Sequence, residues 1–313
     1  MDKRNQTIDK MIILMGFQLL YDFRIPFFLL IFVLFILTLS LNVTIATLIY
    51  YCPTLHHPMF FFLSHLSVCD TTLTTSIVPV MLPGILKGTV KISIAGCIFQ
   101  IQIFATVLSL ECLLLVVMSY DRYLAICHPL RYTSIMNQRF CCRLVTICWA
   151  LGFMVIFSVV LSVSRLEFCG TTIDHFFCDF LPVLQLSCSD TSAVKLQQLV
   201  FAVPVLMFTV ISIIVTYAYI LSAIFRIPSI SGRQKAFSTC SSHVAIVGTF
   251  LGSLIGIYIL PSSGNTLKAN KILSLLYTIG TPLFNPIIYC VRNKEIKVAF
   301  EKCIWKRKEK EML

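Results

Sequence analysis

The chain is poor in charged residues. Asp, Glu, Lys and Arg make up only 12% of its 313 residues, whereas 58% are apolar. Soluble domains carry charge on about a quarter of their residues, so this composition excludes a soluble globular protein. A membrane-spanning helix needs roughly 20 mainly apolar residues, and the chain has room for seven, with short connections. We therefore expect an all-α membrane protein, namely a seven-transmembrane helix bundle with a short amphipathic C-terminal helix.

The chain also lacks the marks of a multidomain protein. It has no low-complexity linker, no short-period repeat and no stretch that reads as a soluble domain. Residues 1–10 are polar, and the first apolar run continues directly into a span, so we expect no cleavable signal peptide.

The distribution of positive charge predicts the orientation. The net charge is +11; with the N-terminus outside, 15 of the 25 Lys and Arg residues lie on the inner side, as the positive-inside bias requires. Asn5 begins a glycosylation acceptor, Asn-Gln-Thr, which is outside in this orientation. The basic residues are scattered over short loops, which argues against nucleic-acid binding. We expect residues 1–24 to be extracellular, residues 25–291 to form the bundle in membrane lipid, and residues 292–313 to form a cytoplasmic tail.

The 14 cysteines separate by location. Cys97, Cys169, Cys178 and Cys188 fall on the extracellular side, where disulfides persist, and four cysteines allow three pairings. Most of the others fall in spans or at their inner ends, where Cys acts as a small apolar residue. Zinc is the alternative for the outer four, but their spacing lacks a CxxC pair and no His pair flanks them. We favour disulfides.

The most informative stretch is Met118–Tyr132, which reads MSYDRYLAICHPLRY. It places Asp121 beside Arg122 at the end of a long apolar run, and charges at membrane depth usually mark a working site. A lone Arg there would be read as a side chain that extends to the membrane surface. The whole run, however, resembles the signature of the odorant receptors, a branch of the rhodopsin-like G-protein-coupled receptors.

Further motifs carry the same resemblance from residue 12 to about residue 300. In order along the chain they are LHHPMF (55–60), FCG to LSC (168–188), KAFSTCSSH (235–243) and PLFNPIIYCVRN (282–293). The chain departs from the family pattern at Phe60, Val80 and Leu251, where the family has Tyr, Lys and Tyr. The resemblance implies two disulfides, Cys97–Cys178 and Cys169–Cys188, and no enzymatic activity.

The resemblance also implies a set of coupling and switch residues near the cytoplasmic ends of the spans. They are Asp121, Arg122, Tyr123, Tyr217, His243, Asn285, Pro286 and Tyr289. Proline removes a backbone hydrogen bond and kinks a helix, which permits two packings of similar energy; the alternative is an ordinary kink. On activation, Arg122 would leave Asp121 and help to form a cytoplasmic cleft for a G protein.

Two carboxylates, Asp70 and Glu111, fall in the middle of adjacent spans. Desolvation and mutual repulsion would protonate one of them, whereas a bound cation would keep both ionised. The resemblance suggests Na⁺, with Asn42 and Asn285 nearby, and no other cofactor; a protonated structural pair is the alternative. An intramembrane aspartyl protease is a third interpretation, which the absence of a GxGD motif excludes.

The resemblance places a ligand pocket in the upper bundle, between the third, fifth, sixth and seventh spans. The candidate lining residues are Phe104, Ala105, Leu108, Ser109, Phe201, Val205, Leu251, Leu254, Ile255, Tyr258 and Thr278. For each of them, plain packing between helices is the alternative. None is charged, so a small, neutral and mostly apolar molecule fits best.

The implied function is that of an odorant receptor in the plasma membrane, expected in the cilia of sensory neurons. Binding of a volatile molecule would activate a heterotrimeric G protein of the stimulatory, olfactory type and raise cyclic AMP. A chemosensory receptor for a metabolite, expressed outside the olfactory epithelium, is the alternative. A transporter or channel would need paired inverted repeats or broken helices in both halves, and the sequence has neither.

Overall fold

A computed structural model describes residues 10–259, 266–292 and 295–301 of the chain. Inside these ranges, the side chains of 19–21, 235–236, 238–239, 242, 253–259, 266–269 and 290–292 remain outside the description. The predicted glycosylation site, Asn5, and the tail beyond residue 301 also lie outside the described residues.

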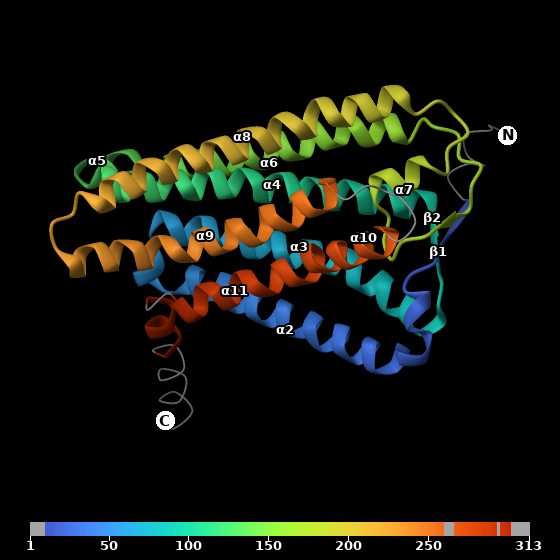
Figure 1. Ribbon diagram of the computed structural model, residues 1–313, viewed down its shortest axis with the longest axis horizontal. Coiled ribbons are helices and arrows are strands. Elements are labelled where there is room, and N and C mark those ends of the chain that lie inside the picture. Colours follow the sequence, from blue (N-terminus) through green and yellow to red (C-terminus); the bar gives the residue numbers. More distant parts are fainter. Residues whose placement is uncertain (1–9, 260–265, 293–294, 302–313) are drawn as a thin grey trace.

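Seven long helical units form a bundle (Figure 1). The first six are α2 (Arg24–Tyr51), α3 (Pro58–Lys87), α4 (Ile94–Cys127), α6 (Gln138–Val163), α8 (Ser192–Phe225) and α9 (Ile230–Ile259). The seventh unit is composed of α10 (Thr266–Leu275), the π-helical turn η3 (Leu276–Gly280) and α11 (Thr281–Arg292). Short helices are η1 (Gln18–Phe23), η2 (Pro53–Leu55), α5 (Pro129–Ile135) and α7 (Phe180–Leu184). The strands are β1 (Met11–Leu14), β2 (Val90–Ser93) and β3 (Thr172–Ile173).

These bounds confirm the seven-helix architecture. Six helical segments of the described part are long and apolar enough to cross a membrane, and a shorter apolar stretch, His243–Gly252, lies in α9. Residues 295–301 are helical after α11, and Ile296 packs into the core, so the predicted C-terminal helix begins within the described part.

Local sequence signals set several helix ends. The Ser93 hydroxyl accepts a hydrogen bond from the Gly96 amide at the start of α4, and the Asn137 side chain accepts one from the Phe140 amide at the start of α6. Both are the N-cap arrangement that satisfies a free helical amide. Helix α3 ends at Gly88, whose φ of 79° lies in the left-handed region that glycine adopts at helix C-termini.

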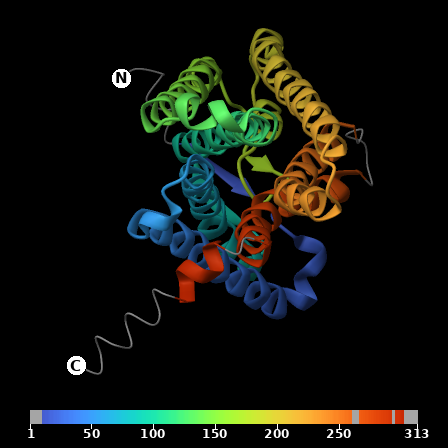
Figure 2. The ribbon, with the colours of Figure 1, turned by 90° about the vertical axis from the view of Figure 1, so that its left-hand side faces the viewer.

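Helix α4 lies at the centre of the bundle, as the view along the bundle shows (Figure 2). It is the most buried of the spanning helices, whereas α8 exposes most of its apolar side chains, as a lipid-facing helix does. Gly152 of α6 permits a close approach to α4, because an added Cβ would lie 3.5 Å from the Thr106 carbonyl oxygen. Small residues at helix contacts are typical of membrane bundles.

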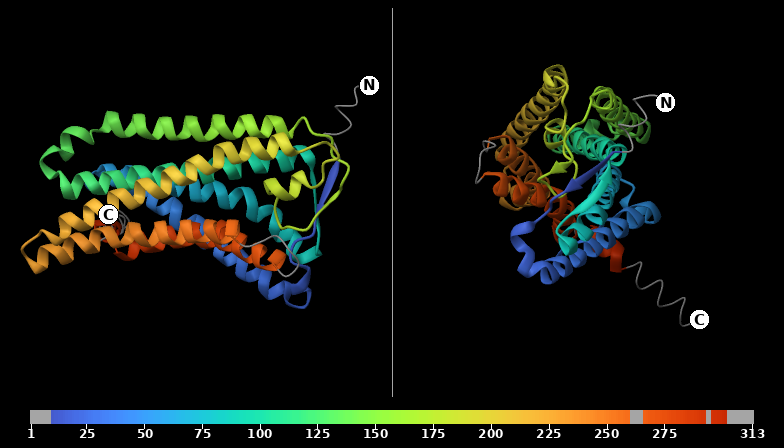
Figure 3. Two further views of the ribbon diagram at one scale, coloured as in Figure 1. Left: turned by 45° about the horizontal axis from the view of Figure 1, so that its top comes forward. Right: turned by 90° about the vertical axis from the view of Figure 1, so that its right-hand side faces the viewer.

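A small sheet lies at the end of the bundle where the described N-terminal residues begin (Figure 3). Its strand order is β2-β1-β3; β1 runs antiparallel to β2, with Met11 opposite Ser93, and parallel to β3, with Ile13 opposite Thr172. Ile12 and Leu14 are fully buried, as expected for alternate residues of a strand with one face on the core. The segment that precedes the first span is therefore part of an ordered structure above the helices.

Candidate functional site

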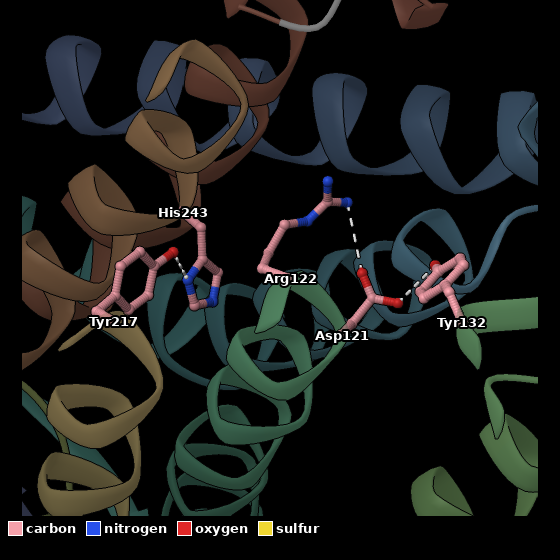
Figure 4. Close-up of polar contacts among 5 residues, drawn as sticks. All are labelled: Asp121, Arg122, Tyr132, Tyr217 and His243. Carbon is pink, nitrogen blue, oxygen red and sulfur yellow. Dashed lines mark hydrogen bonds and ion pairs between the residues drawn. The ribbon is translucent and has the colours of Figure 1, made fainter. Parts of the chain in front are cut away.

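The end of the bundle opposite the sheet brings together several predicted switch residues around Arg122 (Figures 1 and 4). Arg122 Nη2 lies 3.5 Å from Asp121 Oδ2, and Asp121 is fully buried while the Arg122 side chain is 16% exposed. This distance is longer than the 2.7–2.9 Å typical of a charge-assisted hydrogen bond. Arg122 is thus held close to Asp121, but loosely.

The second oxygen of Asp121 is held from a different helix. The Tyr132 hydroxyl, on α5, donates a hydrogen bond of 2.8 Å to Asp121 Oδ1. Burial, followed by the negative charge of Asp121, raises the pKa of the Tyr132 phenol, so this hydroxyl keeps its proton and remains a donor. Sequence reasoning missed Tyr132 as a functional residue, although it is the last residue of the signature stretch.

A second polar pair lies on the other side of Arg122. The Tyr217 hydroxyl, on α8, is 2.8 Å from His243 Nδ1, on α9, and the two rings are stacked. Figure 4 shows Arg122 between this pair and the Asp121–Tyr132 pair. Side chains from four helices, α4, α5, α8 and α9, therefore lie around Arg122. A movement of α8 or α9 would change the surroundings of this side chain.

The remaining switch residues are placed as follows. Tyr123 is half-buried, with its hydroxyl 3.0 Å from His128 Nε2. Pro286 lies inside α11. Tyr289 is buried, and its hydroxyl has no hydrogen-bond partner among the described residues.

The two predicted carboxylates lie deeper in the bundle and are both buried. Asn285 Nδ2 donates to both oxygens of Asp70, each at 3.1 Å, and Glu111 is close enough to interact with Asp70 electrostatically. Asn42 instead donates to the Thr38 and Pro282 carbonyl oxygens, so it ties α2 to α11. The described residues contain no group of three or more His, Cys, Asp or Glu side chains suited to a metal ion.

The structure describes most of the residues predicted to line the pocket. Phe104 is buried against Phe177 and Tyr277, with ring centroids 5.3 and 5.6 Å away. Thr278 donates to the Ser274 carbonyl oxygen at 2.7 Å. The partly buried side chains that pack against the core are Ala105, Leu108, Phe201, Val205 and Leu251.

Ser109 lies next to α6. Its Cβ is 3.9 Å from the position that a Cβ on Gly152 would occupy, so Ser109 faces α6. The side chains of Leu254, Ile255 and Tyr258 fall outside the described residues.

Both disulfides implied by the resemblance are present, Cys97–Cys178 and Cys169–Cys188. A residue that sequence reasoning missed, Gln100, reinforces the first. Its Nε2 donates to the Ser76 carbonyl oxygen at 2.6 Å, and its Oε1 accepts from the Cys178 amide at 2.8 Å. One buried side chain thus joins α3, α4 and the long loop between α6 and α8.

Comparisons with known proteins identify a matching family and a matching fold. A family model described as "Olfactory receptor" matches residues 30–307. Olfactory receptor 2A12 of Homo sapiens is 43% identical over 97% of this chain and 98% of its own. Olfactory receptor 5P56 of Mus musculus is 43% identical, also over 97% and 98% of the two chains. The crystal structure of squid rhodopsin superposes with a TM-score of 0.72 over 88% of this chain and 78% of that one; at 16% identity it supports the fold alone.

Proposed function

Because the chain belongs to the olfactory receptor family, we propose that an odorant bound in the upper bundle activates a stimulatory, olfactory-type G protein and raises cyclic AMP. The receptor would stand in the plasma membrane with its N-terminus outside. The observation that carries the proposal is the position of Arg122, a partly buried cation that lies between two hydrogen-bonded pairs, Asp121–Tyr132 and Tyr217–His243.

Arg122 has spare hydrogen-bonding capacity in this arrangement. Its Nε has no partner among the described residues, and neither does Asp121 Oδ2, apart from the ion pair of 3.5 Å. Buried polar atoms normally find partners, so a second arrangement with better hydrogen bonds would compete with this one. We propose that outward movement of α9, which would separate His243 from Tyr217, releases Arg122 into such an arrangement and opens a cleft for the G protein.

The cytoplasmic surface beside this switch has a feature suited to a protein partner. Leu130 on α5 is 96% exposed, and it is two residues from Tyr132, whose hydroxyl bonds to Asp121. A large apolar side chain fully in water is stabilised when a partner covers it. Helix α5 would therefore give the G protein a contact that is linked directly to the Asp121–Arg122 pair.

The expected ligand follows from the upper bundle. Phe104 contacts the rings of Phe177 and Tyr277. The Thr278 hydroxyl donates a hydrogen bond to the Ser274 carbonyl oxygen. Apolar and aromatic surfaces with a few hydrogen-bonding groups suit a small neutral molecule, whereas a carboxylate or an ammonium group would lack a counter-ion.

The Asp70 region fits a Na⁺ ion. Oxygen ligands suit hard cations, and both Glu111 Oε1 and Asn285 Oδ1 are buried with no hydrogen-bond partner among the described residues. Asp70, Glu111 and Asn285 would hold the ion, whose charge would allow both carboxylates to stay ionised.

A cyclic AMP reporter assay tests the proposal. Cells that express the receptor, the olfactory G protein and trafficking helpers would be exposed to a broad panel of volatiles, with Arg122→Ala as the test variant. Arg139→Ala is the matched control, because Arg139 is an exposed cytoplasmic arginine outside the site. We expect responses in the wild type and the control and none in Arg122→Ala at equal surface expression. Equal responses from Arg122→Ala would refute the proposed coupling role.

A further inference from the structure

An ordered lid covers the extracellular end of the bundle. We use the word lid for residues 11–17, 90–93 and 168–188, which contain the three-stranded sheet, α7 and both half-cystines of the Cys169–Cys188 bridge. Parts of the chain that are about 80 and 160 residues apart in sequence thus meet in one structure.

One edge of the lid is fixed covalently. Cys178 is bonded to Cys97 near the start of α4, and Gln100, one turn further along α4, binds the Cys178 amide. Lys10 adds hydrogen bonds from its ammonium group to the Phe168 and Cys169 carbonyl oxygens, both of 3.1 Å. This edge cannot leave α4 without breaking a disulfide.

The opposite edge is held by a side chain from the seventh helical unit. Lys271 Nζ, on α10, donates to Asp174 Oδ1 at 2.6 Å and to the Gly16 carbonyl oxygen at 2.9 Å. A single ammonium group therefore joins α10 to two segments of the lid. The Lys271 side chain is 15% exposed and that of Asp174 is 55% exposed, and partly exposed ion pairs of this kind contribute little compared with a disulfide.

Beneath the lid, aromatic rings form an unbroken series down to the bundle. Phe17 stacks on Phe176, Phe176 contacts Phe177, and Phe177 contacts Phe104, with centroid distances of 5.1, 5.0 and 5.3 Å. Phe176 and Phe177 are completely buried. With the lid in this position, these rings separate Phe104 from extracellular water.

We propose that Lys271 is a latch: release of its bonds to Asp174 and Gly16 lets the lid swing on its disulfide edge and opens the way from outside to the Phe104 region. The inference rests on the proposed function, since the molecule admitted would be the odorant. The hinge lies at Cys97–Cys178 because a disulfide joins that edge to α4, and the opening lies beside α10, where Lys271 supplies hydrogen bonds and one ion pair.

Thiol labelling tests the latch without any odorant. A cysteine placed at Ala105, eight residues beyond Cys97 on α4, reports on access beneath the lid; a membrane-impermeant thiol reagent is applied to intact cells, and the receptor without the added cysteine gives the background. We expect Lys271→Met to label about fivefold faster than the latched receptor, the effect of losing a pair of this exposure. Lys271→Arg, which keeps the charge and the donors, should restore slow labelling.

The matched control is Lys91→Met, an exposed extracellular lysine on β2, which should label at the parent rate. If Lys271→Met fails to reach the surface, Asp174→Asn takes its place and should also accelerate labelling. Equal rates in the latched and unlatched receptors, or the same acceleration in Lys91→Met, would overturn the inference. Faster labelling in a receptor that answers no volatile would support the latch while counting against the proposed odorant function.

Discussion

Replacing Asp121 by Asn removes one charge from the centre of the switch and little else. The Asn side chain has the same shape, and its oxygen can still accept the hydrogen bond from the Tyr132 hydroxyl that Asp121 Oδ1 accepts in the native protein. The ion pair to Arg122 is lost. The substitution therefore tests the hold on Arg122 separately from the contact with α5.

The size of the effect follows from the geometry of the pair. Exposed ion pairs contribute up to about 1 kcal/mol, and breaking a buried pair costs about 3–5 kcal/mol. This pair has a fully buried carboxylate, but the Arg122 side chain is 16% exposed and the separation is 3.5 Å, so an intermediate value of about 1.5 kcal/mol is expected from these two limits. Such a change shifts an equilibrium about tenfold, so a resting receptor that is about 1% active would become about 10% active.

Basal cyclic AMP, normalised to receptor at the cell surface, measures this shift. Asp121→Asn should raise the basal signal several-fold without ligand, and the double variant Asp121→Asn/Arg122→Ala should return it to the level of cells without receptor, because the released guanidinium is what couples. An unchanged basal signal in Asp121→Asn at equal surface expression would refute the view that this carboxylate restrains Arg122.

Three further predictions concern the two ends of the bundle. Leu130→Ser should reduce the maximal response without changing the odorant concentration that gives half of it, because Leu130 is exposed on the cytoplasmic side; a shift in that concentration alone would contradict a docking role. Gln100→Leu breaks two buried hydrogen bonds, which costs about 2 kcal/mol at roughly 1 kcal/mol each, and thermal unfolding of the purified receptor should show a lower midpoint. Burial, and then the Lys271 charge, lower the pKa of His175 from 6.5 to about 3. His175 therefore takes up a proton between pH 7 and pH 5.5 when the lid is open but stays neutral when it is closed. The free energy that favours the closed lid over the open lid should fall by about 1.3 kcal/mol over this range. Labelling beneath the lid, relative to an exposed reference thiol, should rise roughly eightfold over this range, and a His175→Asn receptor that kept the full rise would exclude His175 as its source.

The helices were accessible to prediction because each span carries its own signal. Residues 94–127 are mainly apolar, with Ser93 before them and His128-Pro129 after them, and α4 covers Ile94–Cys127. The strand pairs of the small sheet, in contrast, join segments that are far apart in the sequence. Strand β1 has only four residues, and its partners lie about 80 and 160 residues away, so no local pattern in the sequence indicates the sheet.

The residues of the candidate site were likewise predictable where the signal is local and were missed where it depends on distant contacts. Residue types at short spacing identified Asp121 and Arg122, and the family resemblance supplied the disulfide pairs. Tyr132 and Gln100 were missed because their roles consist of contacts with other segments, the buried carboxylate of Asp121 and the amide of Cys178. The resemblance named Ser109 as a candidate lining residue, but it could not supply the neighbour that the structure shows, Gly152 of α6.

Ligand-dependent nucleotide exchange measures the central claim most directly. Membranes that contain the receptor and the olfactory G protein would be assayed for GTP-analogue binding with and without an active volatile from the cyclic AMP screen, for the wild type and for Arg122→Ala. We expect faster exchange with the volatile in the wild type and no change in Arg122→Ala at equal receptor density. Volatile-dependent exchange that persists in Arg122→Ala would show that Arg122 does not couple the odorant to the G protein.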